Sequence, residues 1–363
     1  MHSSKASRNL LILLATGLLI GCGGGSSDFT ALDGGGGSSS AEIKCSRHSD
    51  VRLQDISDEG IRLTSALGLA AGRYALPATE DPTQLVVMFH GNHNDSCAWR
   101  NHLRQAAARG AVAVAMDYTG QRQEPVENYG WFVKEGAADS IAAAKLFMAR
   151  YPSIQQVFAF GISMGGNASG VAVASPDAVR SDGSRLFDWW VDVEGVNNLV
   201  EQYLVARAIV PVNPSAATAV QEIEEENGGT FEQVPDAYVE ITNVARVQDM
   251  AGLKGVVLVN GLDDGLVPTI QSPEMTLALN AAGIPAHQYT VLLRGDGESG
   301  STATGLVGDL LFAALGLEYP APLAGHGWEG SDTHLVIKTG FEQLYVLMEG
   351  ANVAPGLTVI PGF

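Results

Sequence analysis

The sequence has few basic residues for its length. Its 21 lysines and arginines face 40 aspartates and glutamates, so the formal net charge is −19. Binding to nucleic acid depends on clustered cations that displace counterions from the phosphates. The composition therefore argues against a nucleic-acid partner and favours an acidic exported protein.

Several motifs that would indicate a metal or a nucleotide are also missing. The chain has no HExxH pair, no CxxC and no GxxxxGK[ST] loop, which are the usual signs of zinc sites, redox centres and bound phosphates. It shows no repeat of fixed period, which excludes a solenoid or a propeller. We therefore expect no metal and no cofactor, and nothing in the sequence sets the oligomeric state. The chain does contain 46% hydrophobic residues, which is enough for a substantial core.

The first residues lack an apolar run long enough to span a bilayer. Lys5 and Arg8 precede an apolar stretch at 10–20, and Cys22 follows almost at once. A short positive start and a short apolar run are typical of a secretory signal peptide. The closing tetrapeptide Leu-Ile-Gly-Cys resembles the lipobox of bacterial lipoproteins, which implies that residues 1–21 are removed and Cys22 is acylated. A plain signal peptide that is cleaved elsewhere is the alternative.

Residues 22–44 start with Cys22 and are dominated by glycine and serine. Such a composition cannot form a packed core, and we interpret it as a flexible tether. Position 23 is glycine and not aspartate, which by resemblance to the Gram-negative sorting rule favours the outer membrane. We therefore expect an exported protein, lipid-anchored to the bacterial cell envelope, in the outer membrane if the cell is Gram-negative.

Only two other cysteines are present, Cys45 and Cys97. Because the expected compartment permits disulfides, we expect these two to pair. The bond would connect the segment after the tether to the loop that contains position 97. Two unpaired buried thiols are the alternative, since sequence does not supply the geometry of a disulfide.

Residues 45–363 alternate short apolar runs with longer helical patterns. This alternation predicts an α/β fold with a mostly parallel central sheet and helices on both faces. The expected strands are 85–89, 111–116, 157–160, 189–193, 256–259 and, as the last, 288–293. The expected helices are 99–109, 135–150 and a closing helix at 335–348.

The segment at about 196–250 differs in character from the rest. It contains several prolines and glycines and the acidic run Glu-Ile-Glu-Glu-Glu at 222–226. We interpret it as an insertion that forms a cap over the functional edge of the sheet. A solvated excursion without a role in binding is the alternative, because a charge run usually marks an exposed face.

The pentapeptide Gly-Ile-Ser-Met-Gly at 161–165 places Ser163 between an apolar strand and a helix of small residues. A serine hydroxyl is a weak nucleophile unless it is held where a base can take its proton. A tight strand-to-helix turn holds it in this way, and only glycine avoids crowding at such a turn. Ser163 is therefore the candidate nucleophile.

A second turn supports this interpretation, because His90 and Gly91 follow the expected strand 85–89. Together with the Ser163 turn, it resembles the α/β-hydrolase superfamily over most of the chain. In that family the amide just after the His-Gly turn and the amide after the nucleophile form the oxyanion hole, which implies Asn92 and Met164 here. His90 itself is expected to be structural, and an ordinary turn role is the alternative for Asn92.

The family's acid often lies in the pattern Gly-x-x-Asp-x-x-Val-Pro, and residues 261–268 read Gly-Leu-Asp-Asp-Gly-Leu-Val-Pro. The resemblance assigns the acid to Asp264, which would fix the tautomer of the base and stabilise the imidazolium. Its neighbour Asp263 is the alternative. Asp192 and Glu194, which follow an earlier strand, are weaker candidates.

Two histidines near the end of the chain qualify as the base. His326 lies between small residues in Ala-Gly-His-Gly-Trp and resembles the family's histidine loop, whereas His334 precedes the closing helix and could cap it. We favour His326 and keep His334 as the alternative. His93 and His102 are expected to be surface or turn residues.

The order Ser163, Asp264, His326 is the order that this fold uses. The resemblance implies an esterase-like or lipase-like serine hydrolase that cleaves small-molecule or polymeric carboxylic esters through an acyl-enzyme. A prolyl-oligopeptidase-like peptidase is the first alternative, although the stretch ahead of the fold is too short for a propeller. A non-catalytic ligand-binding surface lipoprotein is the alternative of another class, since a fold does not guarantee activity.

Overall fold

The computed structural model describes residues 59–120, 130–211, 216–262, 264, 266–292, 326–327 and 334–361. Within these residues, nine strands form one sheet in the order β1-β2-β4-β3-β5-β6-β7-β8-β9. The strands are β1 Glu59–Thr64, β2 Leu69–Ala75, β3 Gln84–Phe89, β4 Ala111–Asp117, β5 Gln156–Ile162, β6 Trp189–Val193, β7 Gly255–Gly261, β8 Ala286–Val291 and β9 Gly356–Ile360. The strands from β4 to β9 pair in parallel, whereas β1 and β2 join one edge antiparallel.

The central strands are buried on both faces. Every residue of β4 and β7 is buried, and most of them are valine or alanine. Parallel strands that helices cover on both sides form continuous apolar runs, and this is the pattern by which the sequence predicts them. The buried side chains gather in two apolar clusters, one on each face of the sheet.

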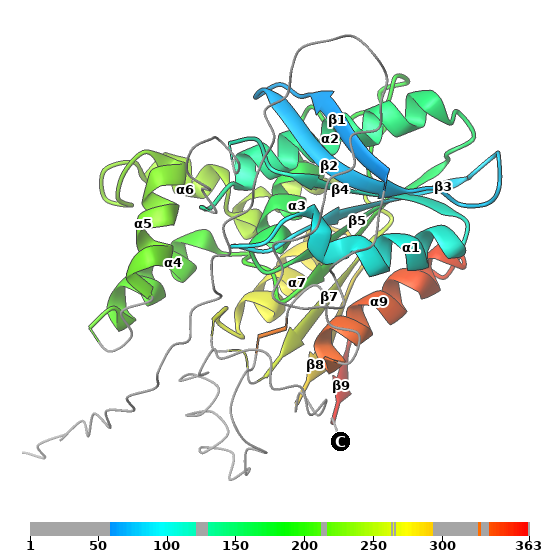
Figure 1. Ribbon diagram of the computed structural model, residues 1–363. Helices are drawn as coiled ribbons and strands as arrows, with labels where there is room; N and C mark the ends of the chain where they lie inside the picture. Colours follow the sequence, from blue (N-terminus) through cyan, green and yellow to red (C-terminus); the bar gives the residue numbers. More distant parts are fainter. Residues whose placement is uncertain are drawn as a thin grey trace, which may run out of the picture.

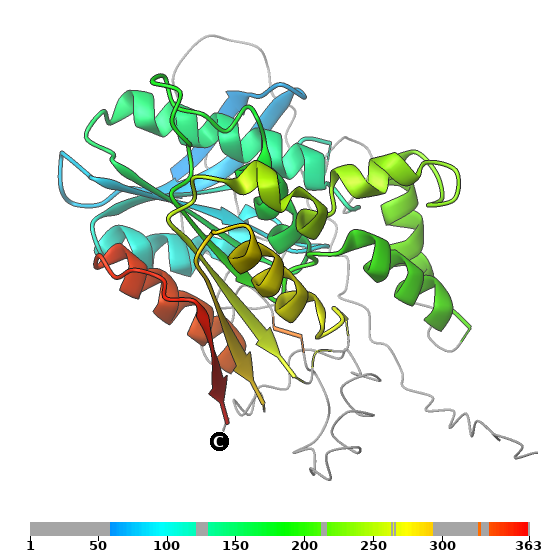
Figure 2. The ribbon, with the colours of Figure 1, turned by 180° about the vertical axis from the view of Figure 1, so that it is seen from behind.

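Helices cover the two faces as separate layers, which Figures 1 and 2 show from opposite sides. One face is covered by α1 (Arg100–Ala108) and α9 (Leu335–Met348), and the other by α2 (Val133–Arg150), α3 (Met164–Ala174) and α7 (Gln271–Ala281). On the first face Phe160 of β5 packs between two aromatic rings. Its ring centroid lies 5.5 Å from that of Trp99 and 4.3 Å from that of Phe341.

Three helices between β6 and β7, here called the helical insertion, project from one end of the sheet (Figure 1). The insertion contains α4 (Leu199–Ile209), α5 (Ala216–Asn227) and α6 (Pro235–Glu240). Each helix contributes fully buried side chains, which are Leu199 and Tyr203 in α4, Ile223 in α5 and Tyr238 in α6. The two tyrosine ring centroids lie 4.9 Å apart. These buried side chains belong to the same apolar cluster as the face of the sheet that α2 and α3 cover.

All the strands and helices expected from the sequence are present, with bounds that shift by up to two residues in the described parts. The closing helix expected at 335–348 is present as α9, whereas the expectation that 288–293 is the last strand is wrong. β9 follows α9 and pairs in parallel with β8. Its residues are mostly exposed, so it lacks the apolar run that marks the central strands. The sequence pattern also misses β1, at the opposite edge, and its neighbour β2, which is only partly buried.

The expectation that His102 is a surface or turn residue is also wrong. His102 lies in α1 and is buried, with its ring stacked on Phe341 at a centroid distance of 3.8 Å. Burial lowers its pKa to about 3, so the ring is neutral at ordinary pH. It is a core residue of the α1–α9 layer.

The predictions for the first residues lie outside the described part of the chain, which begins at position 59. The signal peptide, acylated Cys22, the tether and Cys45 therefore stay predictions. Cys97 is buried and accepts a hydrogen bond from Arg73 Nε at 3.1 Å, and its pairing with Cys45 stays a prediction. Within the described residues, no helix has the length and apolar character that a membrane span requires.

Candidate active site

The carboxyl ends of three neighbouring strands bring polar side chains to one edge of the sheet. Ser163 follows β5, Glu194 follows β6, and Asp264 comes shortly after β7. Backbone bonds hold these ends in register. The Ser163 N–H donates to Val193 O at 3.1 Å, and the Glu194 N–H donates to Val259 O at 2.7 Å. In open parallel sheets, ligands bind outside this edge.

Ser163 occupies a strained turn. Its φ of 56° and ψ of −127° are values that few residues other than glycine adopt. Ser163 is the N-cap of α3, yet its side chain makes no capping hydrogen bond with the helix. A β-carbon at Gly161 would lie 2.2 Å from Gly165 O, and one at Gly165 would lie 2.2 Å from Phe89 O. Glycine at both positions lets β5, α3 and the end of β3 meet at the serine.

The turn after β3 lies against the first turn of α3. A β-carbon at Gly165 would also lie 2.6 Å from His90 O, so the two backbones are in close contact. Tyr118 fixes this turn, because its ring stacks on His90 at 3.9 Å and its hydroxyl donates to His90 O at 3.0 Å. These contacts hold His90 in the turn, and its purely structural role stays a prediction. The N–H groups of Asn92 and Met164 belong to these two adjacent turns, and their role as oxyanion donors stays a prediction.

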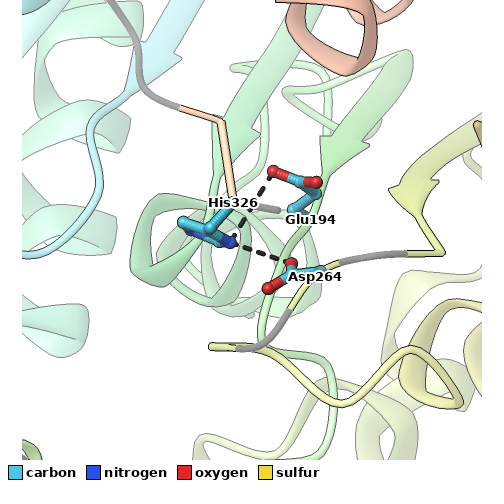
Figure 3. A group of neighbouring side chains, drawn as sticks. All are labelled: Glu194, Asp264 and His326. Atoms are coloured by element: carbon cyan, nitrogen blue, oxygen red, sulfur yellow. Dashed lines mark hydrogen bonds and ion pairs between the residues drawn. The ribbon is translucent and has the colours of Figure 1, made fainter. Parts of the chain in front are cut away.

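His326 and Asp264 form a hydrogen-bonded pair at this edge (Figure 3). His326 Nδ1 lies 2.8 Å from Asp264 Oδ2, and the two side chains are 8% and 3% exposed. The other oxygen, Oδ1, accepts the N–H groups of Leu266 and Val267 at 2.8 and 3.0 Å, which fixes the carboxylate. A carboxylate on Nδ1 favours the tautomer in which Nε2 accepts a proton.

A second carboxylate reaches the same histidine. Glu194 Oε2 lies 3.6 Å from His326 Nδ1 and accepts the Gly327 N–H at 2.7 Å. The Glu194 side chain is fully buried. The sequence makes Glu194 a weaker candidate for the acid than Asp264. In the structure both carboxylates lie near His326, and Asp264 is the closer of the two (Figure 3). The signal available in the sequence is the position of Glu194 directly after the strand next to β5.

Glu194, Asp264 and His326 also form a group that could hold a metal ion. One ligand atom from each lies within 4.8 Å of the others. Two backbone N–H groups already bind Asp264, one binds Glu194, and Asp264 is hydrogen-bonded to the histidine. Hydrogen bonds therefore account for the geometry of the three side chains.

Asp192 has a different set of partners. Its Oδ2 accepts a hydrogen bond from Asn197 Nδ2 at 2.6 Å. Its Oδ1 packs against Gly166, where an added β-carbon would lie only 2.2 Å from that oxygen. Burial raises the pKa of Asp192 to about 7, although the bond from Asn197 acts in the opposite direction. Asn243 Nδ2 donates to both Asn197 Oδ1 and Gly166 O, at 3.2 and 3.3 Å. Asp192 thus belongs to a buried polar network that supports the first turn of α3.

The helical insertion contacts the Asn92 turn through α5. Glu222 Oε2 accepts a hydrogen bond from Asn92 Nδ2 at 2.6 Å, and Glu222 Oε1 lies 2.9 Å from His93 Nε2. The hydrogen bond between His93 and Glu222 is the main cause of the raised pKa of His93. One helical turn further on, Glu226 Oε1 accepts the Lys134 N–H at 3.0 Å, at the start of α2. Two members of the acidic run therefore join α5 to the main domain.

His334, the alternative base, lies directly before α9 and is buried. Its Nδ1 is 3.1 Å from the position that a β-carbon at Gly327 would occupy, so it packs beside the loop that carries His326. The contact with Asp264 is made by His326. Asp263, the alternative acid, lies outside the described residues.

Solved structures show the same fold at low sequence identity. The acylaminoacyl peptidase of Pyrococcus horikoshii aligns with a TM-score of 0.54 and 15% identity, over 83% of this chain and 42% of that chain. Esterase 2 of Thermogutta terrifontis aligns with a TM-score of 0.52 and 18% identity, over 82% of this chain and 94% of that chain. The chain therefore spans less than half the length of the peptidase. No protein-family profile and no curated protein matches the sequence.

The strand order and these structural similarities together define the α/β-hydrolase fold. The fold class expected from the sequence is therefore confirmed.

Proposed function

We propose that the chain is a serine hydrolase that cleaves carboxylic esters through an acyl-enzyme on Ser163. The observation that supports this most directly is the His326–Asp264 hydrogen bond of 2.8 Å at the sheet edge where β5 delivers the strained Ser163 turn. A nucleophile, a base and an orienting carboxylate are the groups that acyl transfer requires. They come from three separate parts of the chain, and Ser163 and Asp264 follow neighbouring ends of the parallel sheet.

In the first half-reaction, Ser163 Oγ attacks the ester carbonyl while His326 Nε2 takes the hydroxyl proton. Asp264 balances the charge that develops on the imidazole. The N–H groups of Asn92 and Met164 donate to the oxyanion, and loss of one such donor typically lowers the rate about 100-fold or more. The bond to the alcohol then breaks, and His326 returns the proton to the departing oxygen.

In the second half-reaction, water takes the place of the alcohol. His326 accepts a proton from the water, whose oxygen attacks the acyl carbon, and the same two N–H groups stabilise the second oxyanion. The bond to Ser163 Oγ breaks, and the serine recovers its proton from His326. The products are the free acid and the starting enzyme.

The class of substrate is tested by comparing esters with an amide. We expect turnover of p-nitrophenyl acetate and butyrate and little turnover of an aminoacyl anilide, with Ser163→Ala as the inactive control. The structural similarity to an acylaminoacyl peptidase makes a peptidase the second candidate. Preference for the anilide would favour the peptidase and contradict ester specificity.

We further propose that the helical insertion is a cap that shapes access to Ser163. The support comes from α5, whose Glu222 binds both Asn92 and His93. A segment that contacts the turn carrying a proposed oxyanion donor is well placed to affect substrate binding.

We also propose that acylated Cys22 anchors the protein to the cell envelope. The support is the lipobox-like tetrapeptide that ends at Cys22 and the Gly/Ser-rich segment that follows it. Expression in a bacterial host with an alkyne-tagged fatty acid should label the membrane-bound wild type, whereas Cys22→Ser should remain unlabelled. An unlabelled wild type would contradict the anchor.

A further inference from the structure

Backbone strain marks an unexpected position beside the proposed triad. Among the described residues, three that are not glycine have positive φ, namely His93, Ser163 and Glu194. The first lies in the Asn92 turn and the second is the proposed nucleophile. Strain of this kind persists only where the surroundings fix the residue, and it gathers at functional sites. Glu194, with φ of 49°, shares this property although the reaction described above does not use it.

The strained backbone directs the Glu194 side chain into the protein, toward the histidine loop. Its carboxylate is fully buried, and a buried carboxylate needs compensating donors. One donor is the Gly327 N–H, 2.7 Å from Oε2. Because Gly327 is the next residue after His326, this bond fixes the backbone that carries the base.

The same oxygen lies near the imidazole itself. Oε2 is 3.6 Å from His326 Nδ1, compared with 2.8 Å for Asp264 Oδ2. Figure 3 shows the two carboxylates approaching the same side of the ring from different loops. Both are therefore close enough to stabilise an imidazolium, and a small ring rotation would bring Nδ1 to hydrogen-bond distance of Glu194.

We propose that Glu194 is a second positioning carboxylate for His326, which holds the histidine loop through Gly327 and takes over from Asp264 when Asp264 is removed. The inference rests on the proposed function of Ser163 and His326. No bond of the substrate is formed or broken by Glu194, which acts only through the orientation and charge of the base.

A double-mutant cycle tests the proposal in the full chain. The variants are Glu194→Gln, Asp264→Ala and the two combined. Glutamine removes the charge but retains an oxygen that can accept the Gly327 N–H, so the loop should fold. Asp188→Asn is the matched control, because Asp188 is a mostly buried carboxylate at the opposite end of β6 that pairs with Arg180 and Lys254.

The expected result is strong non-additivity in kcat for p-nitrophenyl butyrate. Glu194→Gln should lower kcat about threefold when Asp264 is present and about 100-fold when position 264 is alanine. KM should change little, and Asp188→Asn should leave kcat unchanged. The same fold-change in both backgrounds would overturn the proposal, as would loss of activity on chelation that added zinc restores.

A second readout does not depend on activity. The ring of His326 can be titrated by NMR in the wild type and in each variant, with Glu194, Asp264 and the neighbouring His334 as the titratable groups around it. Glu194→Gln should lower the pKa of His326, whereas Glu194→Asp, which retains the charge, should lower it less.

The two readouts separate the possible failures. If the titration moves as expected but the wild type hydrolyses no ester, the proposed function fails and the role of Glu194 stands. If esters are hydrolysed and neither kcat nor the titration responds to Glu194→Gln, the role of Glu194 fails.

Discussion

Gly165 illustrates how a single residue without a side chain determines the geometry of the site. A β-carbon there would lie 2.2 Å from Phe89 O and 2.6 Å from His90 O, both of which are backbone atoms that cannot move aside cheaply. Because α3 begins next to it, any shift would displace Ser163 and the Met164 N–H together. The glycine after the nucleophile is therefore a requirement of packing.

Gly165→Ala should lower the free energy of unfolding by about 3 kcal/mol and abolish ester hydrolysis. Gly110→Ala is the control, because position 110 has φ of +94° but no atom within 4 Å of an added β-carbon. It should lose about 1 kcal/mol through backbone strain alone and retain its activity. Urea unfolding and turnover of p-nitrophenyl butyrate measure both effects. Equal losses in the two variants would contradict the packing argument.

The choice between the two histidines can be made by mutation. His326→Ala should lower kcat/KM about 10,000-fold, because His326 carries the contact with Asp264, and it should also lower Tm, because buried Asp264 loses a hydrogen-bond partner. His334→Ala should lower Tm and change kcat/KM less than tenfold, because that ring is buried beside the loop. The reverse pattern would assign the base to His334.

At this scale the sequence predicts Ser163, Asp264 and His326 because each lies in a short local pattern of glycines and small residues. The structure brings Asp264 and His326 together, although 62 positions separate them. The contact of Glu194 with Gly327 spans 133 positions and leaves no local pattern. Long-range contacts of this kind are set by the meeting of strand ends, which a single sequence does not encode locally.

Among the elements, α5 connects the helical insertion to the proposed site through its acidic side chains. Its residues Glu222 and Glu226 lie one helical turn apart and face the main domain, where they bind the Asn92 turn and the start of α2. Glu225, on the same helix, is exposed. The acidic run is therefore in part a docking surface, which an inspection of charge alone does not reveal.

Glu222→Ala should raise KM for p-nitrophenyl butyrate about fivefold, since α5 would lose its hold on the Asn92 turn. Glu225→Ala, on the exposed side of the same helix, should leave KM unchanged. Steady-state kinetics of the two variants provide the comparison. If both behave as the wild type, the helical insertion has no part in binding through this contact.

Glu226 gives the stability of the protein a dependence on pH. Burial, and next the adjacent Glu135, raise the pKa of Glu226 to about 8 in the folded state, above its ordinary 4.5. Between about pH 4.5 and about pH 8, Glu226 is therefore protonated more fully in the folded chain than in the unfolded chain. The stability that this proton binding contributes is present below the unfolded pKa and is lost as the pH rises through the folded pKa. The loss should be on the order of 5 kcal/mol by about pH 9.

Urea unfolding from about pH 5 to about pH 9 measures this dependence. Glu226→Gln should flatten the decline relative to the wild type, and Glu225→Gln should not. Part of the slope should persist in every variant, because burial also raises the pKa of Asp192 to about 7. Equal slopes in the wild type and Glu226→Gln would contradict the assignment.

For the whole molecule, the sequence predicts the fold class and the central strands because parallel strands buried on both faces are continuous apolar runs. It does not predict the edges of the sheet. β9 is exposed along most of its length, and β1 and β2 form an antiparallel pair at the opposite edge. Such strands are stabilised by pairing with a neighbour that is already in place, and the pattern of their own residues is weak.

The Ser163 hydroxyl is the group on which the proposed chemistry depends. A fluorophosphonate probe reacts only with a serine that a base activates, so it tests the nucleophile and its setting without a choice of substrate. The wild type should be labelled, mass spectrometry should locate the adduct on the peptide containing Ser163, and folded Ser163→Ala should not be labelled. A folded wild type that takes up no probe, or a Ser163→Ala variant labelled as strongly as the wild type, would contradict the account.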